Sequence, residues 1–356
     1  MKVAIVHDFL IYWGGAERVL AGLRDIFPDA PIYTLFYEKK FVKKFFKGAK
    51  ILPSFLQNVP LPRQLLLALM PTAIESFQLK DYDVVLSSGN FSKGVITSPA
   101  TAHINYCHTP PRFLWEESQE YIADNVPFGF RTIASLSLHF LRVWDLSASE
   151  RVDSYIANSR WTATRIKKFY KKDSKIIYPS FFAAAKKEGI TKREEYFLIV
   201  SRLQRYKNIE LAIRACNKLS LPLVIAGEGP DSARLKRIAG DTVTFLGFVQ
   251  EKDLPLLYQD AKAVILPGVE DFGLTLIEAM SYGTPTLAYK KGGAREIIIE
   301  GKTGEFFEEQ TTESLSKGLK KIFTHYQNYK KDEIQKHAQR FSFDRFKKEI
   351  LNIING

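Results

Sequence analysis

The sequence predicts an α/β protein made of two domains, each built around a parallel β-sheet. The chain has 356 residues, which is enough to bury two separate apolar cores. Short apolar runs alternate with helical patterns in both halves, as is typical of parallel sheets with crossover helices. We therefore predict domains at 1–180 and 181–340, joined by a small, charged linker at 183–195. An amphipathic segment at about 341–356 is expected to pack back on the first domain.

Individual elements follow from these apolar runs. In the first half a helix is expected at 16–27, and strands are expected at 3–6, 32–36, 84–86 and 104–107. The second half repeats the alternation more cleanly, with strands expected at 197–200, 223–226, 243–246, 263–266 and 286–288. Helical segments separate these strands, so the second sheet is also expected to be parallel.

Composition excludes several protein classes. Hydrophobic residues make up 46% and charged residues 25% of the chain, the balance of an ordinary globular protein. The two cysteines, Cys107 and Cys216, lie far apart, so we predict neither a disulfide framework nor a cysteine metal site. The first residues lack the pattern of a signal peptide, and no window reaches the ~20 apolar residues of a spanning helix. We therefore expect a cytoplasmic protein.

The net charge of +12 favours anionic partners: nucleic acid, a phosphorylated ligand or an anionic lipid surface. The segment Arg160 to Lys175 holds seven cations and one acid, which keeps a basic nucleic-acid-binding protein open as an alternative. That segment lacks the interleaved glycines and aromatic residues of RNA-binding motifs, and a solvated helix face also explains it.

Two features of the first half are candidates for ligand contact. The first strand is expected to end at His7-Asp8-Phe9, and Gly14 and Gly15 then open a helix whose backbone amides can approach an anion. A tight turn is the alternative for this glycine pair. His108 follows a predicted strand, and Pro110 and Pro111 hold the next loop, so the imidazole can reach a cleft. A hydrogen bond to nearby backbone is the alternative.

Two cations mark the carboxyl edge of the second predicted sheet. Arg202 follows the first strand of this half, and Lys207 precedes the next helix. Ligands bind at this edge of a parallel sheet, and an arginine fork with a lysine point charge can neutralise a diphosphate without a metal. Solvated surface cations are the alternative.

The most specific pattern is a pair of glutamates, Glu270 and Glu278, with Asp271-Phe272-Gly273 between them. A helix is expected to begin near Leu274 or Thr275, which places Glu270 in the preceding loop and Glu278 two turns into the helix. Carboxylates suit sugar and ribose hydroxyls, and amides at a helix start suit phosphate or sugar oxygens. A helical glutamate on a solvated face is the alternative.

Together these residues resemble the retaining glycosyltransferases of family 4, over essentially the whole chain. Arg202, Lys207 and the Glu270 to Glu278 motif carry the resemblance, and Gly227-Glu228-Gly229-Pro230, Gly247-Phe248-Val249, Gly292-Gly293-Ala294 and Gly301-Lys302-Thr303-Gly304 add to it. The resemblance implies the GT-B fold: two Rossmann-like domains with parallel sheets facing across a cleft. The first would bind the acceptor and the second the nucleotide sugar.

The resemblance also implies a role for each matching residue. Arg202 and Lys207 would hold the donor diphosphate, Glu278 the ribose, and Glu270 the transferred sugar. The remaining implied donor contacts are backbone amides at Phe272, Gly273, Leu274 and Thr275, the phosphate-facing Gly14 and Gly15, and Phe248 and Val249 beside the base. His108 would lie by the sugar and act with Glu270, Arg202 and Lys207 in catalysis. Asp8, Tyr12 and Arg112 are the expected acceptor contacts.

Within the family, Tyr106-Cys107-His108-Thr109-Pro110 with Arg112 and Trp115 resembles bacterial mannosyltransferases of surface-polysaccharide synthesis. The implied reaction is retaining transfer of mannose from GDP-mannose, without cofactor or metal, to a glycan or a polyprenyl-diphosphate-linked glycan. A UDP-sugar donor stays open. So do an epimerase or phosphorylase on the same fold and an inactive GT-B interaction protein.

One segment suggests contact with the inner leaflet of the cell membrane. Lys39 to Lys50 contains six lysines and no acid, with Phe41, Val42, Phe45 and Phe46 at helical spacing. Such a basic amphipathic helix can lie on an anionic bilayer. Packing of the aromatic stripe on its own domain is the alternative. The apolar segments Phe55-Leu56 and Leu65 to Met70 are candidates either for an acceptor groove or for the core.

Overall fold

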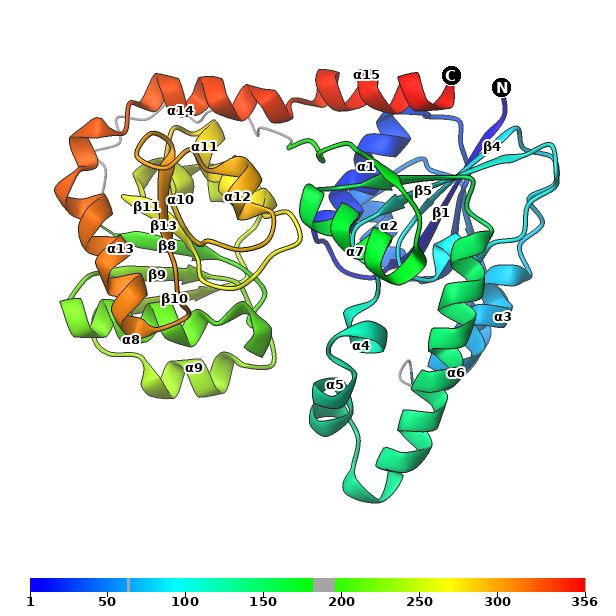
Figure 1. The fold of residues 1–356 in the computed structure, drawn as a ribbon, viewed down its shortest axis with the longest axis horizontal. Helices are drawn as coiled ribbons and strands as arrows, with labels where there is room; N and C mark the ends of the chain where they lie inside the picture. Colours follow the sequence, from blue (N-terminus) through cyan, green and yellow to red (C-terminus); the bar gives the residue numbers. More distant parts are fainter. Residues whose placement is uncertain (63–64, 182–195, 356) are drawn as a thin grey trace. The chain divides into compact units, whose positions relative to one another are not determined.

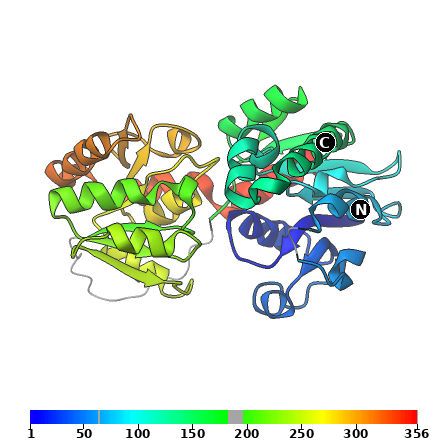
Figure 2. The same cartoon turned by 90° about the horizontal axis from the view of Figure 1, so that it is seen from below.

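The computed structural model describes residues 1–62, 65–181 and 196–355. The described chain forms two compact units. The first unit comprises Met1–Pro179 with Phe346–Gly356, and the second comprises Ser180–Arg345. Figures 1 and 2 show helices on both faces of the sheet in each unit. The linker expected at 183–195 lies outside the described residues.

The first unit is built on a seven-stranded sheet in the order β3-β2-β1-β4-β5-β6-β7, in which every pair is parallel. Its strands are β1 (Val3–Leu10), β2 (Ile32–Tyr37), β3 (Ile51–Pro53), β4 (Val84–Ser88), β5 (Ala102–Cys107), β6 (Ser154–Ala157) and β7 (Ser174–Ile176). Its helices are α1 (Gly15–Ile26), α2 (Lys39–Phe45), α3 (Met70–Glu75), α4 (Arg112–Trp115), α5 (Ser118–Asn125), α6 (Arg131–Glu150) and α7 (Arg160–Tyr170), with the short 3-10 helices η1 (Phe55–Asn58), η2 (Leu67–Leu69), η3 (Ser92–Gly94) and η4 (Phe128–Phe130).

The second unit has a six-stranded parallel sheet in the order β10-β9-β8-β11-β12-β13. Its strands are β8 (Phe197–Val200), β9 (Leu223–Ala226), β10 (Val243–Gly247), β11 (Ala263–Leu266), β12 (Thr286–Tyr289) and β13 (Gly304–Phe307). Its helices are α8 (Ile209–Leu219), α9 (Ser232–Ile238), α10 (Leu254–Asp260), α11 (Leu274–Ser281), α12 (Ala294–Ile297), α13 (Thr312–Thr324) and α14 (Lys331–Ala338), with η5 (Arg205–Lys207), η6 (Tyr326–Asn328) and η7 (Gln339–Phe341).

The last helix, α15 (Phe343–Ile354), begins in the second unit and ends in the first. Its Phe346 is fully buried, and the Phe346 ring centroid lies 6.0 Å from that of Tyr106 on β5. Ile350, one turn further along α15, is also fully buried. The apolar side of the terminal helix is therefore part of the first unit's core.

Helix α2 shows where the segment Lys39 to Lys50 places its aromatic side chains. Phe41 and Phe46 are buried, and the Phe45 ring stacks on that of Trp13 at 4.2 Å between centroids. The lysines of this segment are exposed. Packing of the aromatic stripe on its own domain, the alternative expectation, is therefore what the structure shows, while membrane contact through the exposed lysines stays a prediction.

The apolar segment Leu65 to Met70 is divided between core and surface. Leu66 and Met70 belong to the core cluster under the first sheet, whereas Leu65 and Leu69 are exposed. Of the pair Phe55-Leu56, only Leu56 is buried.

Both cysteines are buried and neither is in a disulfide. Among residues 1–62, 65–181 and 196–355, no helix is both long enough and apolar enough to cross a bilayer.

We predict that His103 makes the first unit less stable in acid. His103 is fully buried on β5, where its ring contacts Ser87 Oγ at 2.8 Å and the Arg151 carbonyl at 3.2 Å. Burial lowers the pKa of His103 from 6.5 to about 4. Between pH 6.5 and about pH 4, His103 is protonated in the unfolded chain but neutral in the folded chain. Stability is therefore lost as the pH falls from 6.5 to about 4, by about 3 kcal/mol for this residue.

Chemical denaturation across this pH range would measure the loss, with His103→Asn as the comparison. The variant should show a shallower dependence of unfolding free energy on pH, because it has no imidazole to protonate. Equal slopes for the two proteins would contradict the prediction.

Candidate active site

The order of strands in the second unit defines where its loops meet. Connections leave β8 toward β9 on one side and β11 toward β12 on the other, so the direction of winding reverses between β8 and β11. Ligands of open parallel sheets bind outside the carboxyl ends of the strands at this reversal. Arg202 and Lys207 follow β8, and Glu270 follows β11. Three predicted site residues thus lie on the loops that flank one reversal point.

Lys207 and Glu270 form an ion pair across these loops, between Nζ and Oε1. Only about a fifth of the Glu270 side chain and less of the Lys207 side chain is exposed. Burial is the largest single effect and lowers the pKa of Lys207, but the charges of Glu270 and Tyr206 and the hydrogen bonds to them together outweigh burial, and the pKa lies above its ordinary value of 10.5. Lys207 is therefore a fixed cation. Arg202, by contrast, is exposed at the start of the same loop.

Close contacts between backbones hold the two loops in place. A Cβ atom on Gly268 would lie 2.9 Å from Lys207 Cα, and one on Gly293 would lie 2.4 Å from Phe272 Cα. The Gly293 amide also donates to the Glu270 carbonyl at 2.9 Å. Any side chain at these positions would push the loops apart. Gly268 thus lets the loop of Glu270 lie against that of Lys207, and Gly293 lets the loop after β12 lie against that of Glu270.

Helix α11 begins at Leu274, directly after Gly273, as the sequence predicted. Phe272 is buried, and its ring lies 5.8 Å from that of Phe341. Thr275 is half-buried in the first turn. Glu278 is the fifth residue of the helix and lies one turn in rather than the two turns expected, since one turn takes 3.6 residues.

Glu278 is buried rather than solvated. Its Oε2 accepts a hydrogen bond of 2.7 Å from the Tyr258 hydroxyl, and the Tyr258 carbonyl in turn accepts from Thr284 Oγ1. The alternative of a solvated helix face is therefore excluded for this glutamate. A carboxylate held in this way has a fixed orientation at the carboxyl side of β11.

A pocket of about 400 Å³ lies at the carboxyl ends of β8, β9 and β10. It is lined by Leu203, Gly227, Glu228, Gly229, Ser232, Lys236, Phe245 and Gly247. Phe248, just beyond β10, is exposed, and its amide donates to Glu228 Oε1 at 3.2 Å. Val249 beside it is half-buried. The pocket is therefore lined by the Phe245 ring, the Glu228 carboxylate and the Lys236 side chain together.

The first unit has its own reversal point, between β1 and β4. Asp8 is buried at this point, near the end of β1, which lies at Leu10, one residue beyond the expected end at His7-Asp8-Phe9. Both Asp8 carboxylate oxygens accept backbone hydrogen bonds, from Asn90 at 2.6 Å, Phe91 at 3.0 Å and Ser92 at 2.7 Å. The Asp8 carboxylate thus positions the loop after β4, and its expected contact with an acceptor stays a prediction.

His108 follows β5 and is half-buried. Its Nε2 lies 2.9 Å from Ser88 Oγ at the end of β4, and its carbonyl accepts from Asn158 Nδ2 at 2.8 Å. Burial, with a smaller effect of neighbouring His7, lowers the pKa of His108 from 6.5 to about 3. His108 is thus a neutral imidazole at neutral pH. It can donate or accept a hydrogen bond, but it has no second ring proton to give as a general acid.

Gly14 and Gly15 lie at the start of α1, where backbone amides are open to an anion. The acidic Glu17 in the first turn already lies at this end of the helix, and its Oε1 is 3.5 Å from His7 Nε2. The positive end of α1 is therefore partly balanced by a carboxylate. Of the other predicted contacts, Tyr12 is exposed, and Arg112 pairs with Glu117 at 3.3 Å.

Residues 180–340 match the sequence family described as Glycosyl transferases group 1. This part of the chain is therefore similar to group 1 glycosyltransferases. The matched residues span nearly the whole second unit, and they include the Lys207–Glu270 pair and the start of α11. It agrees with the resemblance found in the sequence, and the whole chain has the GT-B fold.

Two relatives and one solved structure illustrate this likeness. An uncharacterised glycosyltransferase of Methanocaldococcus jannaschii is 33% identical over 46% of this chain and 46% of its own length. An alpha-1,3/1,6-mannosyltransferase of Kluyveromyces lactis is 24% identical over 84% of this chain and 71% of its own. The structure of Anabaena HepE in complex with UDP superposes over 100% of both chains, with a TM-score of 0.74 and 17% identity.

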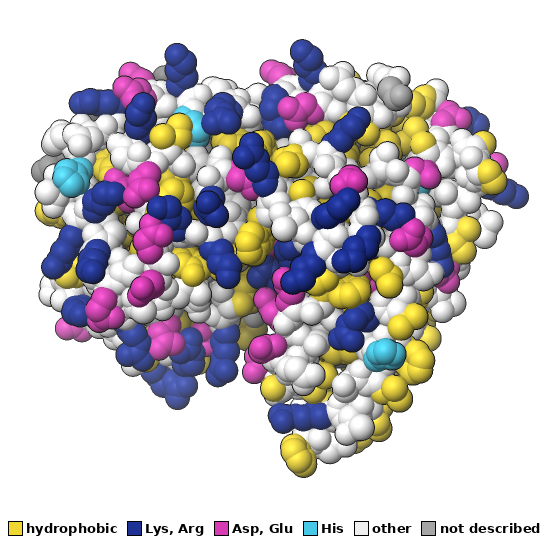
Figure 3. Space-filling view, in the orientation of Figure 1, with side chains coloured by type: hydrophobic (Ala, Val, Ile, Leu, Met, Phe, Trp, Pro, Cys, Tyr) yellow, Lys and Arg dark blue, Asp and Glu magenta, His cyan; other side chains and the backbone are white. Residues whose placement is uncertain are grey.

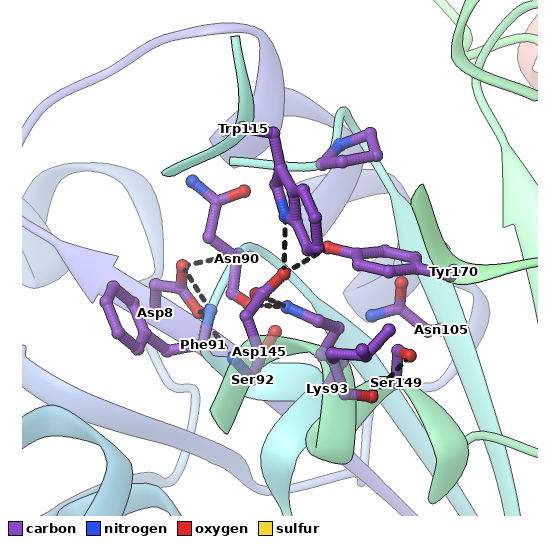
Figure 4. A network of polar contacts seen from close by, with 12 residues as sticks. Asp8, Asn90, Phe91, Ser92, Lys93, Asn105, Trp115, Asp145, Ser149 and Tyr170 are labelled. Carbon is purple, nitrogen blue, oxygen red and sulfur yellow. Dashed lines mark hydrogen bonds and ion pairs between the residues drawn. The ribbon is translucent and has the colours of Figure 1, made fainter. Parts of the chain in front are cut away.

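A buried charge network in the first unit is not evident from the sequence patterns. Lys93 and Asp145 form a fully buried ion pair between η3 and α6 (Figure 4). Asp145 Oδ2 also accepts from Trp115 Nε1 and from the Tyr170 hydroxyl, each at 2.9 Å, and Lys93 Nζ donates to the Asn90 carbonyl at 2.5 Å. The network therefore joins α4, α6 and α7 to the loop held by Asp8.

We predict that Asp145→Asn costs about 3–5 kcal/mol of folding stability, because it leaves the Lys93 ammonium buried without a counter-charge. The double variant Lys93→Met/Asp145→Asn should lose less, since no unpaired charge remains while the amide oxygen still accepts from Trp115 and Tyr170. Chemical denaturation measures each loss. The exposed pair Lys167–Asp173 supplies the matched control Asp173→Asn, expected to cost little. Equal losses for Asp145→Asn and Asp173→Asn would contradict the prediction.

Proposed function

We propose that the chain is a retaining glycosyltransferase that binds the diphosphate of a nucleotide sugar at the carboxyl edge of the second sheet. The observation that carries this proposal is the Lys207–Glu270 pair, held at the β8–β11 reversal point of the unit that is similar to group 1 glycosyltransferases. Lys207 supplies a fixed cation, Arg202 an exposed guanidinium fork, and the first turn of α11 open amides. These groups together suit an anionic leaving group.

The proposed chemistry needs no nucleophile from the protein. As the bond between the anomeric carbon and the phosphate oxygen breaks, negative charge grows on the diphosphate, and Arg202 and Lys207 stabilise it. The acceptor hydroxyl attacks from the face that the phosphate leaves, and the departing phosphate oxygen takes the acceptor's proton. Glu270 binds hydroxyls of the transferred sugar, and Glu278 binds the ribose. Configuration at the anomeric carbon is thereby retained.

The proposed place for the nucleobase is the 400 Å³ pocket beside Phe248 and Val249. We propose GDP-mannose as the donor, supported by the likeness to the Kluyveromyces lactis mannosyltransferase. A UDP-sugar is the second candidate, because the Anabaena structure of the same fold holds UDP. The proposed acceptor is a glycan or a lipid-linked glycan. The roles of Gly14, Gly15, His108, Tyr12 and Arg112 remain predictions from the sequence resemblance.

We predict that Arg202→Ala and Lys207→Ala each lower the slow hydrolysis of GDP-mannose by about 100-fold or more, because each removes a charge that stabilises the leaving diphosphate. Release of GDP without acceptor measures this rate. Lys317→Ala, at an exposed lysine on α13 of the same unit, is the matched control and should hydrolyse the sugar at the normal rate. Hydrolysis that survives in both site variants would contradict the placement of the diphosphate.

Binding of GDP and UDP to the full chain distinguishes the candidate donors. Tighter binding of GDP supports GDP-mannose, and tighter binding of UDP supports a UDP-sugar. Binding of neither nucleotide, with steeply salt-dependent binding of oligonucleotides, would instead support the basic nucleic-acid-binding alternative.

A further inference from the structure

Helix α6 presents a second apolar face that the first unit leaves exposed. Its inner side carries Leu138 and Leu141, which belong to the core cluster under the sheet. The opposite side carries Ile133, Leu136, Phe140 and Val143, of which Phe140 is 63% exposed and the others are comparably exposed. A helix that is apolar on both sides is normally covered on both sides. This one is covered on a single side by the described part of its own chain.

The exposed face continues at the end of α6 into the turn that precedes it. Phe128 is 86% exposed in η4, and Phe130 is also exposed. Figure 1 shows α5 and α6 running away from the sheet of the first unit to a tip at this turn. In Figure 3 hydrophobic side chains gather along the same region and at its end. Exposed apolar patches of this kind mark surfaces that bind a partner or a membrane.

Charge along this face favours a lipid bilayer. From Val126 to Trp144 the chain has no aspartate or glutamate, whereas Arg131, His139 and Arg142 lie on α6 itself. Arg131 donates to the carbonyls of Val126 and Ala123, which fixes the turn while its charge stays at the tip. An apolar helix face bordered by cations is the pattern of interfacial membrane helices.

Pairing of this face with a second copy of the chain is less well supported. Ile133, Leu136, Phe140 and Val143 have the 3-4-3 spacing of a coiled-coil seam. The positions that flank such a seam are Thr132, Ser137, His139 and Trp144. None of these can form the complementary charge pairs that choose a partner helix. Lipid acyl chains need no matching pattern of side chains, so they fit this face better than a second helix does.

We propose that the outer face of α6 and the Phe128–Phe130 turn dock on an anionic lipid bilayer. Phe128, Phe130, Ile133, Leu136 and Phe140 enter the boundary between headgroups and acyl chains, and Arg131 at the tip contacts lipid phosphates. This surface is separate from the segment Lys39 to Lys50. It is independent of the proposed transferase chemistry, because none of its residues lies at the β8–β11 reversal point.

Sedimentation with phosphatidylcholine–phosphatidylglycerol vesicles tests this proposal on the full chain. We expect the natural protein to bind, and Ile133→Ser/Phe140→Ser to lower the partition coefficient about 100-fold, since each side chain contributes roughly tenfold when buried in lipid. Ile299→Ser, at an exposed isoleucine of the second unit, is the matched control and should bind normally. Vesicles of phosphatidylcholine alone should bind the natural protein more weakly.

Several results would overturn the proposal. One is failure of the natural protein to bind vesicles, and another is unchanged binding by the double variant. A third is that the natural protein is a dimer and the double variant a monomer, with no vesicle binding by either. Phe128→Ser provides a second variant should the double variant not fold, because Phe128 lies outside the helix. It should bind about tenfold more weakly. Unchanged binding by Phe128→Ser would also overturn the proposal.

Discussion

The ion pair between Lys207 and Glu270 depends on the meeting of two loops at one reversal point in a parallel sheet. Neither side chain lies within a strand or a long helix, so the sheet positions both only through the short loops that follow β8 and β11. Gly268 lets these loops lie backbone to backbone. The proposed phosphate site, the buried Glu278 and the start of α11 are all arranged around this contact.

The first unit uses the same topology with a different interaction. At its reversal point, between β1 and β4, a carboxylate rather than an ion pair joins the loops, since Asp8 accepts from three successive backbone amides. The Lys93–Asp145 network then connects that loop to three helices. Polar groups buried so completely are stable only when their partners are all in place. They therefore fix the loop after β4, beside which Ser88 contacts His108.

Local sequence patterns predicted much of the fold. The strands expected at 197–200, 223–226 and 263–266 match β8, β9 and β11, because parallel strands buried on both faces are continuous apolar runs. The end of β1, expected at His7-Asp8-Phe9, lies one residue further along at Leu10, and His7 and Asp8 have buried partners in the fold. Strand order, and with it the meeting of Lys207 and Glu270, depends on contacts between distant segments that local patterns do not contain. Local patterns also do not show which apolar helix face will be covered. The aromatic residues Phe41 and Phe46 around α2 are buried, whereas α6 has an apolar face that is exposed.

A crystal structure of the full chain with GDP is the most direct test of the central claim. The proposed site predicts the diphosphate within hydrogen-bonding distance of Arg202 and Lys207, beside the first turn of α11, with the ribose at Glu278 and the base near Phe248. A diphosphate bound away from the carboxyl ends of β8 and β11 would contradict the assignment of this edge as the donor site.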